Sequence, residues 1–169
     1  SILIQLPFFF IVSVFLLWTI TGNYEAAKFI ACSVVIVFLN IALKFSFSYF
    51  SNNASWTLRP TSNDCEGLLL PGKSQLTASS GMPSGHSQLA GFFMVYGICM
   101  IWKQSSPNMN VAEKILSTIF LSIICLVITF SRIFPNKCHS TIQIIVGFII
   151  GGLLGIAAYA AAHPEMPIF

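Results

Sequence analysis

The chain has 169 residues, of which 56% are hydrophobic and only 8% are charged, and its net charge is +3. In a soluble domain about a quarter of the residues are charged, so this chain lacks the polar surface that a water-soluble fold needs. The small net charge argues against a nucleic-acid partner, and the five cysteines show no metal-binding spacing. The composition predicts an integral membrane protein, and no linker or repeat divides residues 1–169 into more than one domain.

Five apolar runs are long enough to cross a bilayer as helices, which takes about 20 residues. They cover residues 2–20, 25–47, 84–103, 112–134 and 139–162. No basic segment precedes the first run, so we expect a retained helix there rather than a cleavable signal peptide. The sequence therefore predicts an all-α, multi-pass bundle of about five transmembrane helices.

The last run contains glycines at four-residue spacing, Gly147, Gly151 and Gly155. Small residues at this spacing allow helices to approach closely in a membrane. We expect this stripe to serve packing within the chain rather than dimerisation, and the oligomeric state stays open.

Unusual polar residues fall at the ends of the even-numbered runs and at the starts of the odd-numbered runs that follow. Because crossings alternate in direction, all of these positions should meet at one membrane face. They are Lys44, Arg59, Ser84, Gly85, His86, Ser131, Arg132 and His139. Ionisable groups near a membrane usually mark function. His163 lies at the opposite face, where we expect it to contact interfacial water.

These residue types suit chemistry on a phosphate. Arginine matches phosphate oxygens with paired donors, and a helix start favours an anion. A histidine can attack phosphorus or donate a proton near neutral pH, and two histidines could divide these roles. The sequence offers no acidic cluster for Mg²⁺, so the cations should neutralise the charge.

The stretch Pro83-Ser84-Gly85-His86, followed by Ser131-Arg132 and His139, resembles the motifs of the type 2 phosphatidic acid phosphatase (PAP2) superfamily. The family pattern is KxxxxxxRP, then PSGH, then SRxxxxxHxxxD. Within the family, GMPSGHSQ and Gln143 in place of the final acid look closest to dolichyl-diphosphatase-like enzymes. The resemblance runs from about Asn40 to Gly155.

The resemblance implies a role for each matching residue. His139 would attack phosphorus to form a phosphohistidine, and His86 would protonate the leaving group and then help to activate water. The phosphate would be held, with no metal or other cofactor, by Lys44, Arg59, Ser84, Gly85 and Arg132. Gln143, four positions after His139, would face the same side of a helix and orient the nucleophile by accepting its N–H.

The first motif departs from the family pattern, because Lys44 and Arg59 are 15 positions apart rather than seven. Along a straight helix this spacing is about 22 Å, too far for one phosphate. We therefore expect the segment 45–58 to fold back near Asn52 and Asn53. Otherwise Lys73 or Lys137 would replace Lys44 as a ligand.

The function predicted from these observations is hydrolysis of a polyprenyl diphosphate, such as dolichyl diphosphate, to the monophosphate and inorganic phosphate. One alternative is a broader lipid phosphatase that acts on phosphatidic acid. Another is a structural membrane protein with weak activity, since Gln143 lacks the charge of a carboxylate. The loop charges do not decide the orientation. The resemblance suggests the endoplasmic reticulum, with the active site on the lumenal side.

Overall fold

The computed structural model describes residues 2–52, 54–60, 80–104, 109–134 and 138–165. Lys73 and Lys137, the two alternative phosphate ligands, lie outside these ranges, and so does Cys65.

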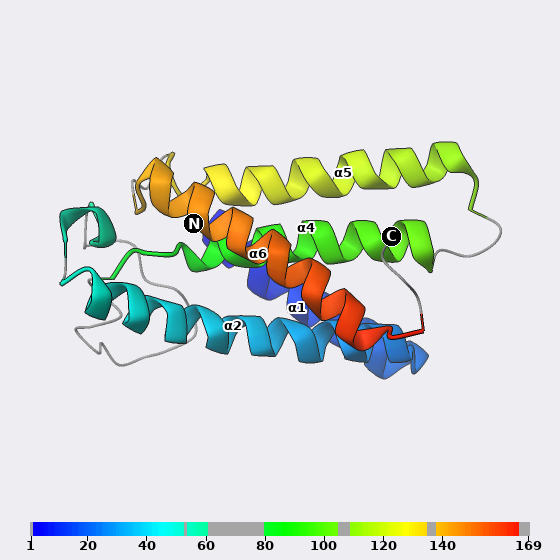
Figure 1. Cartoon of the computed structure of the whole chain (residues 1–169). Helices are drawn as coiled ribbons and strands as arrows, with labels where there is room; N and C mark the ends of the chain where they lie inside the picture. The colour runs from blue at the N-terminus through cyan, green and yellow to red at the C-terminus, as the bar shows by residue number, and fades with distance from the viewer. Residues whose placement is uncertain (1, 53, 61–79, 105–108, 135–137, 166–169) are drawn as a thin grey trace.

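The predicted all-α fold with five long helices is confirmed (Figure 1). The long helices are α1 (Ile2–Thr21), α2 (Tyr24–Phe50), α4 (Gly85–Lys103), α5 (Val111–Phe130) and α6 (Thr141–Ala162), and a short 3₁₀ turn, η1, covers Ser55–Thr57. The largest differences from the predicted bounds are at three ends: α2 continues to residue 50 rather than 47, α5 stops at residue 130 rather than 134, and α6 starts at residue 141 rather than 139.

The start of α6 is set by Ser140, which caps the helix. Its hydroxyl accepts a hydrogen bond from the backbone N–H of Gln143 at 3.4 Å, and Oε1 of Gln143 accepts one from the backbone N–H of Ser140 at 3.3 Å. This capping box satisfies N–H groups that the first helical turn leaves without intrahelical partners. As a consequence, His139 precedes the helix instead of belonging to it.

Helix α4 lies in the middle of the bundle, between α2 and α5, and α6 crosses it (Figure 1). Three aromatic residues of α4, Phe92, Phe93 and Tyr96, surround Phe29 of α2, with ring centroids 5.2–5.7 Å from that of Phe29. Between helices in a membrane, such close packing stabilises through van der Waals contacts. The core therefore fixes α4 against α2 and carries the polar start of α4 with it.

The glycine stripe of α6 packs against the backbone of α4, as predicted for packing within the chain. A Cβ atom on Gly147 would lie 2.7 Å from the carbonyl oxygen of Ser84, and one on Gly155 would lie 3.1 Å from that of Phe92. A Cβ on Gly151 would collide with the carbonyl of Gln88. The two helices thus touch backbone to backbone over two turns of each helix.

Three of the described helices, α2, α5 and α6, are long and apolar enough to cross a membrane, judged by length and composition. Large apolar side chains such as Phe38, Phe120 and Leu153 are exposed on their outer faces. Apolar surface of this extent needs lipid around it. The chain is therefore an integral membrane protein. Helix α4 is the more polar partner enclosed by the others, with Ser87 and Gln88 buried near its start.

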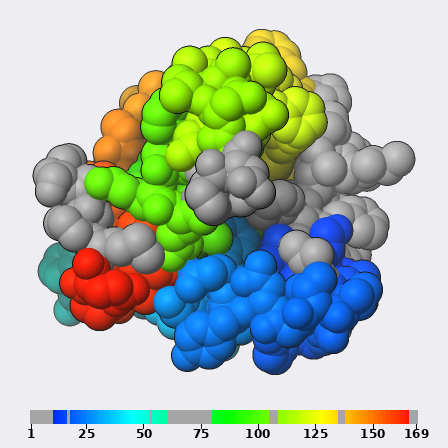
Figure 2. Space-filling view, turned by 90° about the vertical axis from the view of Figure 1, so that its right-hand side faces the viewer, coloured from blue at the N-terminus to red at the C-terminus, as the bar shows by residue number. Residues whose placement is uncertain are grey.

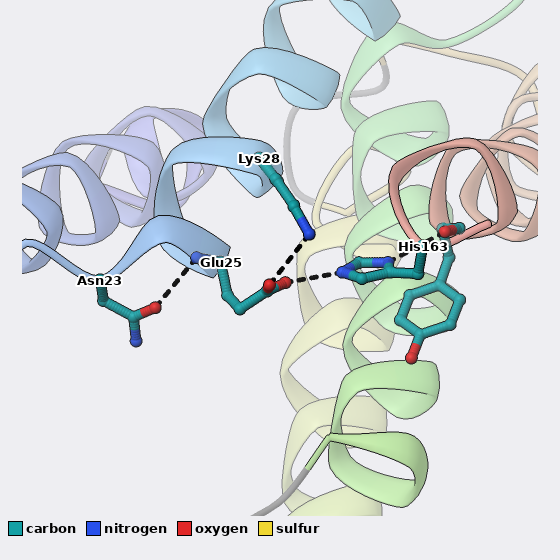
Figure 3. A network of polar contacts seen from close by, with 5 residues as sticks. Asn23, Glu25, Lys28 and His163 are labelled. Atoms are coloured by element: carbon teal, nitrogen blue, oxygen red, sulfur yellow. Dashed lines mark hydrogen bonds and ion pairs between the residues drawn. The ribbon is translucent and has the colours of Figure 1, made fainter. Parts of the chain in front are cut away.

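At one end of the bundle, the last turn of α6 packs against the first turn of α2 (Figure 2). There His163 is fully buried, with Nε2 2.6 Å from Oε2 of Glu25 and Nδ1 3.0 Å from the carbonyl oxygen of Tyr159 (Figure 3). Lys28 contacts the other oxygen of Glu25 at 3.0 Å. The expectation that His163 contacts interfacial water is wrong, because α2 and Tyr159 enclose its ring, which lies 4.4 Å from that of Tyr159.

Candidate active site

At the opposite end of the bundle, Lys44 near the end of α2 is buried, with 9% of its surface exposed. Its Nζ donates a hydrogen bond to the carbonyl oxygen of Ser80 at 3.1 Å. A lysine that only anchors a helix end would extend its ammonium group into water. Lys44 instead points into the protein, and an ammonium group has three hydrogens to donate.

Arg59 returns to Lys44 because the chain reverses after α2. Asn52 has a φ of 48°, in the left-handed region where asparagine is among the few tolerated side chains. After η1, Leu58 pairs with Ser80 in an antiparallel bridge, and the N–H of Gly81 donates to the carbonyl of Thr57 at 2.7 Å. Because Lys44 also binds Ser80, the predicted fold-back is confirmed, and Lys44 and Arg59 share one end of the structure.

Arg132 is more deeply buried than Lys44, with 1% of its surface exposed in the turn that follows α5. Its Nε and Nη1 have no hydrogen-bond partner among the described residues. Burial, and then the nearby charge of Arg59, lowers the pKa of Arg132 to about 10. A buried guanidinium with unused donors is a site that an anion would stabilise.

His139 is buried, with 4% of its surface exposed, immediately before the cap of α6. Burial lowers the pKa of His139 well below its ordinary value of 6.5, and the charges of Arg59, Lys44 and Arg132 lower it further. The hydrogen bond to Gln143 opposes this shift. The imidazole is therefore neutral at neutral pH, which is the form that can attack phosphorus.

Gln143 makes the contact with His139 that the sequence predicts, although His139 is not itself helical. Oε1 of Gln143 lies 3.1 Å from Nδ1 of His139. The amide nitrogen of Gln143 donates to the carbonyl oxygens of Trp56 at 2.9 Å and Leu58 at 2.8 Å. The contacts of Gln143 with Trp56 and Leu58 were not predicted, because every residue has a main-chain carbonyl and the residue type does not show which one is used.

The start of α4 brings the GMPSGHSQ stretch to the same place. Ser84 is buried at the N-cap, and its backbone N–H donates to the carbonyl oxygen of Gln143 at 3.1 Å. A Cβ on Gly85 would lie 2.9 Å from Oδ1 of Asn40, so only glycine fits without a shift. His86 is the second residue of α4 and is half-buried. Ser84, Gly85 and His86 thus stand where the sequence places them, beside the start of α6.

At this end of the bundle, the structure shows contacts of several residues that the sequence analysis did not predict. Nδ2 of Asn40 donates to Oε1 of Gln88 at 2.7 Å, and both side chains are buried. The sequence contains one signal for a role of Asn40 at this site, because Asn40 lies one helical turn before Lys44 and therefore on the same side of α2. The hydroxyl of Ser131 donates to the carbonyl of Ile128 at 2.7 Å, so its hydrogen is already used within its own turn. Cys138, next to His139, is disulfide-bonded, whereas Cys32, Cys99 and Cys125 are free.

The third motif is one residue longer than the family pattern, with six residues between Arg132 and His139 instead of five. The two side chains still interact, because the charge of Arg132 acts on His139. The charges of Lys44, Arg59 and Arg132 thus all act on the buried His139. This arrangement can bind a phosphate group and present an imidazole nitrogen to its phosphorus atom.

Comparison with protein families gives a match over most of the chain. The PAP2 superfamily matches residues 25–167 of the chain.

The chain belongs to the PAP2 superfamily. It is also similar to a dolichyldiphosphatase of Saccharomyces cerevisiae (strain ATCC 204508 / S288c), with 39% identity over 75 residues. That match covers 44% of this chain and 30% of the yeast protein, so the chain spans less than a third of that relative. No solved structure matches the chain. The yeast relative is, by its name, a phosphatase.

Proposed function

We propose that this PAP2 protein is an integral membrane lipid phosphatase that hydrolyses a polyprenyl diphosphate of the dolichyl type. Its products would be the lipid monophosphate and inorganic phosphate. Family membership and the yeast relative support a lipid phosphatase. The observation that carries the proposal is the buried His139, which lies 3.1 Å from Oε1 of Gln143 and whose pKa is lowered by burial and by the charges of Arg59, Lys44 and Arg132.

In the first step, Nε2 of His139 attacks the terminal phosphorus atom and forms an N–P bond. The bond from phosphorus to the bridging oxygen breaks, and its electron pair goes to that oxygen. His86 donates a proton to the leaving lipid phosphate. The developing charge on the phosphoryl oxygens is neutralised by Lys44, Arg59 and Arg132, whose charges already act on His139.

In the second step, a water molecule attacks the phosphohistidine. His86, now deprotonated, accepts a proton from the water, the N–P bond breaks, and His139 regains its neutral form. Inorganic phosphate leaves, and both histidines are restored. Each proton given in the first step is returned in the second, so one water molecule is consumed per turnover.

The proposal assigns charge neutralisation to side chains and not to a metal ion. Lys44, Arg59 and Arg132 bring three positive charges to one position, whereas a magnesium site needs carboxylates and other oxygen ligands. Protonated lysine and arginine repel a metal cation by their positive charge, and they offer no lone pair to coordinate one. Full activity in EDTA is therefore expected.

We further propose that the site faces an oxidising compartment, such as the lumen of the endoplasmic reticulum. Cys138, the neighbour of His139, is disulfide-bonded, and disulfides persist in oxidising compartments and are rare in the cytosol. A glycosylation acceptor inserted into the segment 61–79 tests the orientation in microsomes. Modification of this acceptor supports a lumenal site. If this acceptor stays unmodified while a second acceptor, inserted at residues 105–108, is modified, a lumenal site is contradicted.

The function is tested by phosphate release from detergent-purified protein in EDTA, with a polyprenyl diphosphate and phosphatidic acid compared at equal surface concentration. His139→Ala runs alongside, with His163→Gln as a control that changes a histidine at the other end of the bundle. Release from the diphosphate that is lost only in His139→Ala supports the proposal. Faster release from phosphatidic acid would favour the broader lipid phosphatase, and no release from either lipid by folded protein would favour a structural role.

A further inference from the structure

The side-chain amide of Gln143 connects two parts of the candidate site. It is fully buried. Its oxygen lies 3.1 Å from Nδ1 of His139, and its nitrogen donates to the carbonyls of Trp56 and Leu58, which are 87 and 85 positions away in the chain. One side chain therefore touches both the proposed nucleophile and the loop that carries Arg59.

The two loop carbonyls decide which way the amide points. A carbonyl oxygen can only accept a hydrogen bond, so the group that faces Trp56 and Leu58 must be the NH₂ end of Gln143. The oxygen of the amide then faces His139, and it also can only accept. Nδ1 of His139 must therefore carry the hydrogen. A neutral imidazole has one such hydrogen, which leaves the lone pair on Nε2.

The same hydrogen bonds hold Arg59. The carbonyl of Leu58 belongs to the peptide unit that joins Leu58 to Arg59, so the amide of Gln143 fixes the backbone directly before the arginine. Gly81 closes the remaining space, because a Cβ on it would lie 2.5 Å from Oε1 of Gln143. Gly81 also binds the loop, through its N–H and the carbonyl of Thr57.

We propose that Gln143 is a positioning residue that couples the tautomer of His139 to the placement of Arg59. This inference rests on the proposed function and adds a reason for an amide at this position. An ionised carboxylate has no hydrogen to donate, and a protonated one has a single hydrogen. Either form leaves at least one of the two loop carbonyls without its partner, so an acid at position 143 orients His139 but releases the Arg59 loop.

Two substitutions separate the two tasks of Gln143. Gln143→Glu keeps an oxygen for His139 and removes the NH₂ group, whereas Gln143→Met keeps the length of the side chain and removes both contacts. Gln104→Glu is the matched control, because it makes the same chemical change at the end of α4, away from the site. The readouts are kcat and KM for phosphate release from a polyprenyl diphosphate, the ¹⁵N spectrum of His139, and amide exchange of residues 54–59.

For Gln143→Glu we expect the His139 tautomer to be unchanged while the loop amides exchange at least about tenfold faster. KM should rise by about tenfold or more, because Arg59 no longer holds its position, and kcat should fall less. For Gln143→Met we expect the same faster exchange, together with a mixed tautomer and a lower kcat. Gln104→Glu should change none of these quantities.

Unchanged loop exchange in folded Gln143→Glu would overturn the inference, and so would a loss confined to kcat. Exchange and the ¹⁵N spectrum do not depend on turnover, so they decide the coupling even if the wild type releases no phosphate. In that case inorganic orthovanadate serves as the probe, and its binding should weaken in Gln143→Glu. If the exchange and the ¹⁵N spectrum show the coupling but the wild type has no phosphatase activity, the coupling stands and only the proposed function is contradicted.

Discussion

Nε2 of His163 lies 2.6 Å from a carboxylate oxygen of Glu25, although the two residues are 138 positions apart in the chain. Nδ1 of the same ring faces the carbonyl oxygen of Tyr159, so both ring nitrogens face acceptors. Each contact brings a ring nitrogen within hydrogen-bond distance of an oxygen of another residue. The pair joins the start of α2 to the end of α6, at the end of the bundle opposite His139 (Figure 3).

Replacement of His163 by alanine should therefore lower stability and not catalysis. We expect a loss of about 2 kcal/mol, since the change removes a charge-assisted hydrogen bond and a buried ring. Denaturant unfolding in detergent measures it. Lys28→Ala, which removes only the partly exposed partner of Glu25, should cost less than about 1 kcal/mol. Equal losses in the two variants would contradict a special role for the buried histidine.

Arg132→Lys should weaken phosphate binding even though the positive charge is kept. Lysine cannot reproduce the planar set of donors that the buried guanidinium offers, of which Nε and Nη1 are unused among the described residues. We expect the inhibition constant of inorganic phosphate to rise by about tenfold. The control is Lys103→Arg, the reverse exchange at the far end of α4. An unchanged inhibition constant would remove Arg132 from the proposed set of ligands.

The pH profile of kcat/KM should report the lowered pKa of His139. Burial and the charges of Arg59, Lys44 and Arg132 disfavour the protonated ring, so the neutral nucleophile persists as the pH falls below the ordinary 6.5. Activity should be lost only as the pH falls through the lowered pKa. Arg59→Gln removes the largest of the three charge effects and should move this acid limb to higher pH. A limb that stays in place would show that His139 does not control it.

Gly151→Ala should destabilise the protein, because the added methyl group meets the carbonyl of Gln88. We expect a loss of about 1–3 kcal/mol in thermal unfolding, the usual range for overpacking. Gly152→Ala is the neighbouring control, since its Cβ would only touch Val95 at an ordinary 3.4 Å. That variant should keep or slightly raise stability, because alanine favours a helix. A stable Gly151→Ala protein would contradict the backbone contact.

The sequence predicts the parts of this protein that depend on local patterns. Apolar run lengths located the five helices, and alternating crossings brought Lys44, Arg59 and His139 to one end. The glycine spacing predicted close packing of α6. The apolar runs and the glycine spacing each involve several residues, and the membrane fixes the direction of the crossings. None of these predictions therefore depends on a single residue.

Other features depend on which atoms of distant segments meet, and residue types do not show this. The carbonyls of Trp56 and Leu58 are present in every peptide unit, so their use by Gln143 could not be predicted. The burial of His163 depends on the angle at which α6 reaches α2. The disulfide at Cys138 has no local spacing signal.

The contact between α4 and α6 also limits how the structure of this protein can change through mutation. Where Gly147 and Gly151 meet the backbone of α4, no side chain separates the two helices. Glycine is the smallest residue, so mutation can push these helices apart but cannot draw them closer. The distance between the His86 and His139 segments therefore stands at its lower limit. Variation in substrate among relatives built in this way would have to come from the outer helices α1, α2 and α5, which expose large apolar side chains.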